Sequence, residues 1–179
     1  KKNISVLGSD ISITKNKFDQ QTIPDGWVWE DIGNYYGAGA GAFNWNENQY
    51  DLVLSSGKTE GDPTEIISFE PSTGKKGSGD QAYIYPEPFG IGAFATGTIP
   101  PARERFVIRG SMHDPAFSFI KGLRSYLNEN SIDINQGSNA GFLLANNDPS
   151  FFETIHTIVS PTLDSINYWF LKKSVNLFG

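Results

Sequence analysis

The chain has no cysteine, only two histidines and a single methionine among its 179 residues. The lack of cysteine excludes disulfides and thiolate metal ligands. The histidines, His113 and His156, lie far apart and form no spacing typical of a metal site, so no metal or cofactor is expected. A cysteine-free chain fits an exported bacterial protein and a cytosolic protein equally well.

Basic runs and long apolar runs are also missing. Lys and Arg number 14 against 20 Asp and Glu, for a net charge of −6. Without a basic cluster, no nucleic-acid partner is expected. No apolar stretch approaches the roughly 20 residues that cross a bilayer, so no transmembrane segment is expected. The first residues contain no apolar signal-peptide core, so an export signal would have been removed or lie upstream.

Aromatic residues, in contrast, are abundant: 13% of the chain, with 4 Trp, 7 Tyr and 13 Phe. Residues 27–50 are dense in Trp, Tyr and Gly without a clear period, which predicts a packed loop that presents side chains. Residues 37–42 alternate Gly and Ala and superficially match a dinucleotide fingerprint. They do not open a helix, so they indicate close backbone packing instead.

The pattern along the chain predicts an α+β fold. Asp114 and Pro115 are typical of a helix start, and an apolar stripe continues the helix to about residue 128. The runs that predict strands are residues 4–7, 11–14, 50–55, 65–70, 82–85, 89–99, 105–110, 132–134, 142–145 and 154–159.

Residues 161–179 predict one closing amphipathic helix. Ser160 is a suitable N-cap, and Pro161 suits the first helical position. Apolar residues at three- and four-residue spacing form one face of the helix: Leu163, Ile166, Trp169 and Phe170. Ser174 and Asn176 then form Ser-x-Asn, which accompanies Ser-x-x-Lys and Lys-Thr-Gly in penicillin-interacting serine enzymes. By itself the triplet favours a simple polar helix end over a catalytic motif.

Five stretches, in order and spread over most of the chain, resemble the D-alanyl-D-alanine carboxypeptidase/endopeptidase family of low-molecular-mass class C penicillin-binding proteins. The first matches the family pattern P-x-G-W-x-W-x-D, the second its aromatic-x-Ala segment, the third the strand that follows, and the fourth a strand-to-helix junction. The fifth is the helix that carries Ser-x-Asn. These stretches are residues 24–31, 36–38, 48–52, 107–115 and 160–176.

The resemblance implies a serine-transpeptidase (β-lactamase-like) fold with accessory domains inserted between Ser-x-x-Lys and Ser-x-Asn. Residues 1–158 would be an inserted, mostly antiparallel β region with one packed helix. Residues 159–179 would be a helix of the transpeptidase domain. The chain is expected to lack both the Ser-x-x-Lys and the Lys-Thr-Gly motifs of the family, and with them the nucleophile, so the chain alone is expected to be inactive.

The same resemblance implies an extracytoplasmic enzyme that acts on peptidoglycan stem peptides through an acyl-enzyme and binds β-lactams. Ser174 would relay a proton to the leaving amine, and Asn176 would bind the substrate amide. Asp31 and Tyr36 would hold the free amine end of a stem peptide. A loop-capping role for Asp31 and a core role for Tyr36 remain open.

Trp27 and Trp29 are expected to pack rather than to bind. A second hypothesis also remains open, in which the chain is a non-catalytic module that binds cell-wall glycan or peptide.

Overall fold

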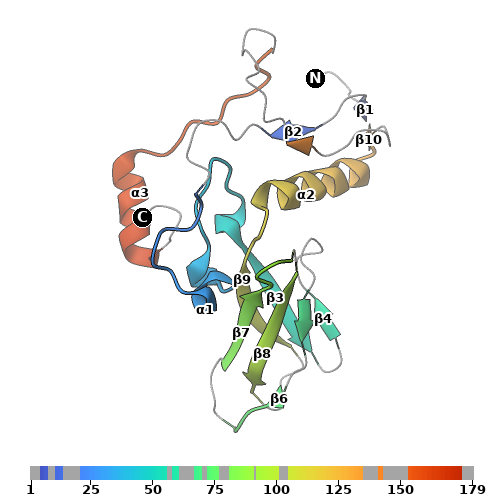
Figure 1. Ribbon diagram of the computed structural model, residues 1–179. Coiled ribbons are helices and arrows are strands. Elements are labelled where there is room, and N and C mark those ends of the chain that lie inside the picture. The colour runs from blue at the N-terminus through green and yellow to red at the C-terminus, as the bar shows by residue number, and fades with distance from the viewer. Residues whose placement is uncertain are drawn as a thin grey trace.

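A computed structural model of the chain has the predicted α+β class, with its helices outside two small β-sheets (Figure 1). It describes residues 5–7, 11–13, 21–55, 58–60, 67–69, 72–76, 81–90, 92–100, 105–134, 141–142 and 153–174. The helices are α1 (Trp29–Ile32), α2 (Pro115–Glu129) and α3 (Leu163–Lys173), with 3-10 turns η1 (Tyr35–Gly37) and η2 (Asn46–Asn48).

The strands agree with most of the predicted runs. They are β1 (Val6–Leu7), β2 (Ser12–Ile13), β3 (Gln49–Ser55), β4 (Lys58–Glu60), β5 (Ile67–Phe69), β6 (Ser72–Thr73), β7 (Gln81–Pro86), β8 (Ala93–Ile99), β9 (Phe106–Ser111), β10 (Asp133–Ile134) and β11 (Gly141–Phe142).

The longest strand pairs are antiparallel, as predicted. One sheet has the order β4-β3-β9, and Leu52 of β3 lies opposite Ile108 of β9. In the other sheet β7 pairs antiparallel with β8, while the short strands β5 and β6 pair parallel with β8. The two-residue strands β1 and β2 pair parallel with β10 and β11. Parallel pairing is therefore confined to the shortest strands.

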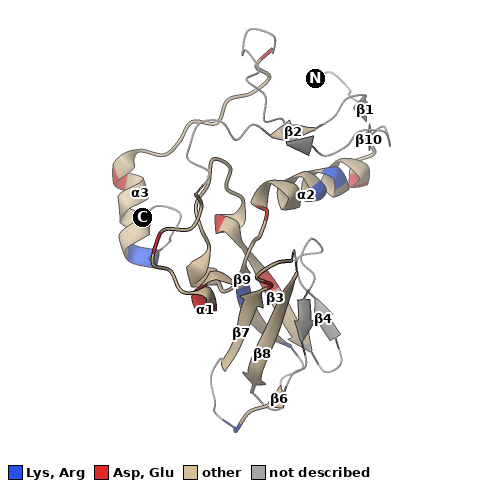
Figure 2. Ribbon diagram, in the orientation of Figure 1, with Lys and Arg blue, Asp and Glu red and all other residues tan. Residues whose placement is uncertain are grey.

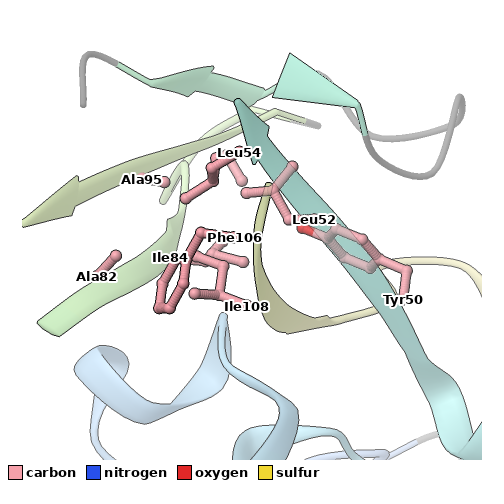
Figure 3. Packing of buried hydrophobic residues seen from close by; sticks show 9 residues of the cluster. Tyr50, Leu52, Leu54, Ala82, Ile84, Ala95, Phe106 and Ile108 are labelled. Atoms are coloured by element: carbon pink, nitrogen blue, oxygen red, sulfur yellow. The ribbon is translucent and has the colours of Figure 1, made fainter. Parts of the chain in front are cut away.

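The main hydrophobic core lies between the two sheets. In Figure 3 the side chains of Leu52, Ile84 and Ile108 point toward one another from β3, β7 and β9. Leu52, Leu54 and Ile84 are each 1% exposed. Alternate residues of β7 enter this core, as the period of a strand with one covered face requires. Burying a side chain of this size contributes roughly 1.5–3 kcal/mol.

A second, smaller core anchors α2. Ala116 and Ile120 are buried together with Ile13 of β2. The helix begins as predicted, because the Asp114 carboxylate accepts hydrogen bonds from the backbone N–H groups of Ala116 and Phe117, both at 3.1 Å. The cap satisfies two donors that have no partner within the helix.

Two predictions near the C-terminus are wrong. Residues 154–159 form no strand and are exposed. Their β-forming residues find no neighbouring strand, so propensity alone does not produce one. Helix α3 begins at Leu163 rather than at Pro161, because Thr162 is the N-cap and its side chain accepts from the N–H of Ser165. The helix contains no fully buried residue: on its apolar face Ile166 and Phe170 are half-buried, while Leu163 and Trp169 are exposed.

Candidate functional site

Residues 27–48, called the aromatic loop below, contain α1 and η1. One buried asparagine fixes this loop to β7. Asn34 is 4% exposed. Its Oδ1 accepts from the N–H of Ile84 at 2.9 Å, and its Nδ2 donates to the carbonyl of Glu30 at 2.8 Å. The Ser111 N–H donates to the carbonyl of Gly33 at 3.1 Å, which joins the same loop to β9. Sequence reasoning missed Asn34, because a single loop asparagine has no spacing that distinguishes it.

The glycines of this loop permit close backbone approach. A Cβ at Gly37 would lie 2.0 Å from the carbonyl oxygen of Asp31, and a Cβ at Gly39 would lie 2.2 Å from that of Thr22. No side chain fits at such distances. The Gly-Ala run is followed by η2 and strand β3, with no helix at its end. The prediction that these glycines serve backbone packing is confirmed.

Asp31 and Tyr36 lie close together on this loop. Tyr36 is 40% exposed, so it is not a core aromatic. Partial burial raises the pKa of the Tyr36 phenol above its ordinary value, and the nearby negative charge of Asp31 raises it further. Asp31 caps the following turn through its backbone carbonyl, which accepts from the Asn34 N–H at 3.0 Å.

Trp29 packs against the sheet, as predicted. Its indole Nε1 donates to the carbonyl of Pro86 at 3.0 Å. Its ring centroid lies 5.0 Å from that of Tyr85 and 6.0 Å from that of Phe94. The ring nevertheless remains 42% exposed. Trp27 is half-buried.

Ser174 lies at the C-cap of α3 and lines a groove shared with the sheet region. Its backbone is left-handed, with φ of 52°, and its N–H donates to the carbonyl of Phe170 at 2.7 Å. The groove has a volume of about 560 Å³. On one side the groove is lined by residues of α3 and its C-cap, among them Trp169, Lys173 and Ser174. On the opposite side it is lined by Tyr35, Glu47, Gln49 and Arg109.

The structure therefore places Ser174 beside the aromatic loop. The loop tyrosine that lines the groove together with Ser174 is Tyr35. Asp31 and Tyr36 do not line this groove. Tyr35 and Tyr36 are neighbours, with ring centroids 5.2 Å apart. Asn176, the other predicted catalytic residue, lies outside the described residues.

A left-handed turn places Glu47 at the groove. Asn46, Glu47 and Asn48 have φ of 49°, 56° and 55°, which is unfavourable for residues other than glycine. Buried Asn48 holds the turn, because its Oδ1 accepts from the Trp45 N–H at 3.0 Å and its Nδ2 donates to the Gly39 carbonyl at 2.8 Å. The asparagine-rich run of residues 44–48 was the available signal, since asparagine tolerates this conformation.

Arg109 is paired within the sheet. It lies directly opposite Asp51 on the neighbouring strand, and its Nε is 3.1 Å from the Asp51 carboxylate. Both side chains are more than half exposed, at 63% and 57%. An ion pair so exposed contributes little to stability. Arg109 therefore faces solvent near the end of β9.

The spacing Ser-x-x-Lys does occur in the chain, at Ser12, Ser55, Ser72 and Ser118. Only Ser118 lies on a helix, where it is 8% exposed and one turn before the half-buried Lys121. Both residues line a cavity of about 680 Å³ between α2 and the β3–β9 edge. The prediction that the chain lacks this spacing is therefore wrong, and the expectation that the nucleophile lies outside this sequence depends on the resemblance alone.

Within the described residues, no three side chains of the types His, Cys, Asp and Glu gather closely enough to hold a metal ion. None of the described helices has the length and apolar character to span a bilayer.

Comparison with known proteins gives a structural likeness without a sequence match. No family model and no curated protein sequence matches the chain. Among solved structures, penicillin binding protein 4 (dacB) from Haemophilus influenzae matches 98% of this chain with a TM-score of 0.72 at 13% identity. The chain spans 40% of the length of that protein. The chain thus has the fold of part of a penicillin-binding protein, which agrees with the predicted resemblance at the level of fold.

Proposed function

We propose that this chain is the accessory region, plus one catalytic helix, of a serine-type D-Ala-D-Ala carboxypeptidase/endopeptidase. The enzyme would act on peptidoglycan stem peptides outside the cytoplasm and would be acylated by β-lactams. Residues 1–158 would form the inserted region, and residues 159–179 would belong to the transpeptidase domain. The fold shared with penicillin binding protein 4 over 98% of the chain supports this proposal.

The observation that carries the proposal is the groove between Ser174 and the sheet region. Ser174 ends the helix on which Ser-x-Asn was recognised, and this end opens into about 560 Å³ of space lined by Tyr35, Glu47 and Gln49. A volume of this size accommodates a short peptide segment. Polar side chains from two parts of the chain converge there, as a peptide substrate with several hydrogen-bonding groups requires.

The exposure of α3 supports the proposed division into domains. On the apolar face, Leu163 is 69% exposed and Trp169 49%, and Ile166 and Phe170 are only half-buried. An amphipathic helix of 11 residues gains most of its stability from burying its apolar face. The proposed transpeptidase domain would cover this face, since the matched solved protein is longer than this chain.

In the proposed reaction a serine outside this chain attacks the carbonyl of the penultimate D-alanine, and a lysine takes its proton. The Ser174 hydroxyl can accept a proton and donate one at the same time, so it would relay the proton to the leaving amine. Asn176 would bond the substrate amide through its carboxamide, which is both donor and acceptor. Asp31 and Tyr36 would hold a free amine of the stem peptide by charge and by ring contact.

The test is the intact mass of the natural protein, with and without excess penicillin. We expect a chain heavier than 19.7 kDa that gains the mass of one antibiotic molecule. In that protein Ser174→Ala should slow D-alanine release at least tenfold, with the fold retained, while Ser160→Ala at the other end of α3 should not. A natural chain of 19.7 kDa without an adduct would contradict the enzyme and leave a cell-wall binding module.

A further inference from the structure

One outer surface of the molecule concentrates five aromatic side chains, of which the proposed reaction uses only Tyr36. It is formed by Trp29 of α1, Tyr36 of η1, Tyr83 and Tyr85 of β7, and Phe94 of β8, and is called the aromatic face below. Trp29 is 42% exposed, and Tyr36 and Tyr83 are each 40% exposed. Large aromatic side chains exposed together are uncommon on soluble proteins and mark binding surfaces.

Strand geometry produces this surface. Ala82 and Ile84 of β7 enter the core, so the intervening Tyr83 and Tyr85 point to the opposite side of the sheet. Tyr85 pairs across the strands with Phe94. Their rings are stacked, with centroids 5.3 Å apart and planes at 17°.

The surrounding helices fix the rings in place. The hydrogen bond from Trp29 to the Pro86 carbonyl holds the indole against this stacked pair. Tyr36 adjoins the same surface, because burial and then the charges of Asp31 and Tyr83 raise the pKa of its phenol. The result is a pre-formed surface of ring faces edged by hydroxyl groups, which costs little conformational entropy when a ligand binds.

The charges around the aromatic face select the class of partner. Strands β7 and β8 contain no charged residue, and α1 adds the carboxylates of Glu30 and Asp31 (Figure 2). Negative charge beside the rings repels an anionic polymer. Carboxylates and phenols are instead suited to bond the hydroxyl and amide groups of an uncharged ligand.

The aromatic face also continues into the groove that Ser174 lines. The Tyr35 ring touches that of Tyr36 edge-on, with centroids 5.2 Å apart, and Tyr35 itself is part of the groove. A linear polymer on the aromatic face would therefore reach the groove entrance. Groups attached along that polymer could enter the groove while the polymer remains bound.

We propose that the aromatic face binds an uncharged, N-acetylated glycan strand, with the sugar rings stacked on Tyr83, Trp29 and their neighbours. Sugars present flat C–H surfaces and a rim of hydroxyl groups, which match ring faces edged by phenols and carboxylates. The choice of an N-acetylated glycan rests on the proposed function, because peptidoglycan strands carry this group. The binding surface itself rests only on the geometry and charge of the aromatic face.

The experiment titrates the protein with a β-1,4-linked hexamer of N-acetylglucosamine and follows tryptophan fluorescence and NMR shifts. We expect saturable binding that Tyr83→Ala weakens about tenfold, because exposed aromatic anchors dominate such contacts. Tyr83→Ala should leave the fold intact, since the ring is 40% exposed. The matched control is Tyr126→Ala, which removes a 61% exposed tyrosine from α2 and should change the affinity less than about twofold.

Three results would overturn the proposal: no binding of the hexamer at millimolar concentration, equal affinity for Tyr83→Ala and the unsubstituted protein, or displacement of the hexamer by a sugar-free D-Ala-D-Ala peptide. The last result would make the aromatic face a peptide site. The penicillin adduct is measured without any glycan and does not involve Tyr83. Glycan binding without an adduct would therefore contradict only the proposed enzyme, and an adduct without glycan binding only this inference.

Discussion

At the scale of single residues, local conformation and local charge decide what a side chain can do. In the aromatic loop the backbone conformation depends mainly on asparagine and glycine: Asn34, Asn48, Gly37 and Gly39. Each of them fixes a backbone position that a larger or less polar residue could not hold. The side chains that face solvent from this loop are therefore presented by a rigid backbone.

The left-handed turn gives the first prediction. Glu47→Gly removes the steric cost of a positive φ of 56° and should raise the free energy of unfolding by about 1 kcal/mol, after the extra freedom of glycine in the unfolded chain is subtracted. Glu129→Gly, in the last turn of α2, should lower it by roughly 0.5–1 kcal/mol. Chemical denaturation of both variants measures the difference. Equal destabilisation by the two substitutions would show that the turn is not strained.

The pKa of Tyr36 gives a prediction about pH. Burial and the charge of Asp31 raise the folded-state pKa above the ordinary value of 10.0, while the unfolded chain loses the proton near that value. The folded state then binds more protons at this group, so the contribution of Tyr36 to stability should be constant below pH 10 and fall as the pH rises above it. Tyr36→Phe should reduce this fall. A phenolate absorbance titration measures the pKa, and a midpoint at or below that of free tyrosine would contradict the prediction.

At the scale of elements, the positions of α1 and η1 depend on contacts with strands far away in the sequence. Asn34 joins this region to β7 across 50 residues, and Ser111 joins it to β9. Helix α2, in contrast, is defined locally by its Asp114 cap and its apolar stripe. The loop region is thus an element that only the assembled sheet stabilises.

Asn34→Ala tests that dependence. The substitution leaves the buried N–H of Ile84 without its hydrogen-bond acceptor, and an unsatisfied buried group costs about 1–3 kcal/mol. We expect a loss of this size in the free energy of unfolding, together with faster hydrogen exchange in residues 29–37. Asn130→Ala at the exposed end of α2 is the control, with an expected loss below about 1 kcal/mol. If the two losses were equal, Asn34 would not be the main attachment.

At the scale of the whole molecule, the sheets and α2 form cores, while α3 packs little of its surface. Figure 1 shows α3 beside the aromatic loop and away from the main sheets. The described part of residues 153–174 contains no buried side chain. The helix should therefore contribute little to the stability of the rest.

Removal of residues 153–179 tests this arrangement. The two hydrophobic cores remain complete, so the Tm should change by less than about 3 °C, since roughly 1 kcal/mol corresponds to 2–4 °C in a chain of this size. Calorimetry of both proteins measures the change. A Tm lowered by about 10 °C would mean that α3 is an integral part of the fold, and would contradict the proposed division near residue 158.

Much of the architecture could be predicted from local pattern. Three local patterns agree with the structure: the alternation of buried and exposed residues in β7 and β9, the Asp114 cap of α2 and the close backbone packing of the Gly-Ala run. Residues 154–159 show the limit, because a β-forming run becomes a strand only beside a partner strand. The N-cap of α3 is Thr162 instead of the predicted Ser160. Several polar residues precede the helix, and the backbone conformation decides which of them is the cap.

The sequence by itself determined the α+β class, the longer strands, helix α2 and the resemblance to penicillin-binding proteins, because hydrophobic period and short motifs are local properties. Only the tertiary structure decided which residues meet: that Tyr35 rather than Tyr36 shares a groove with Ser174, and that Tyr83, Tyr85 and Phe94 form one exposed surface with Trp29. These pairs lie far apart in the chain. Their proximity depends on strand register and on Asn34, and no local pattern encodes it.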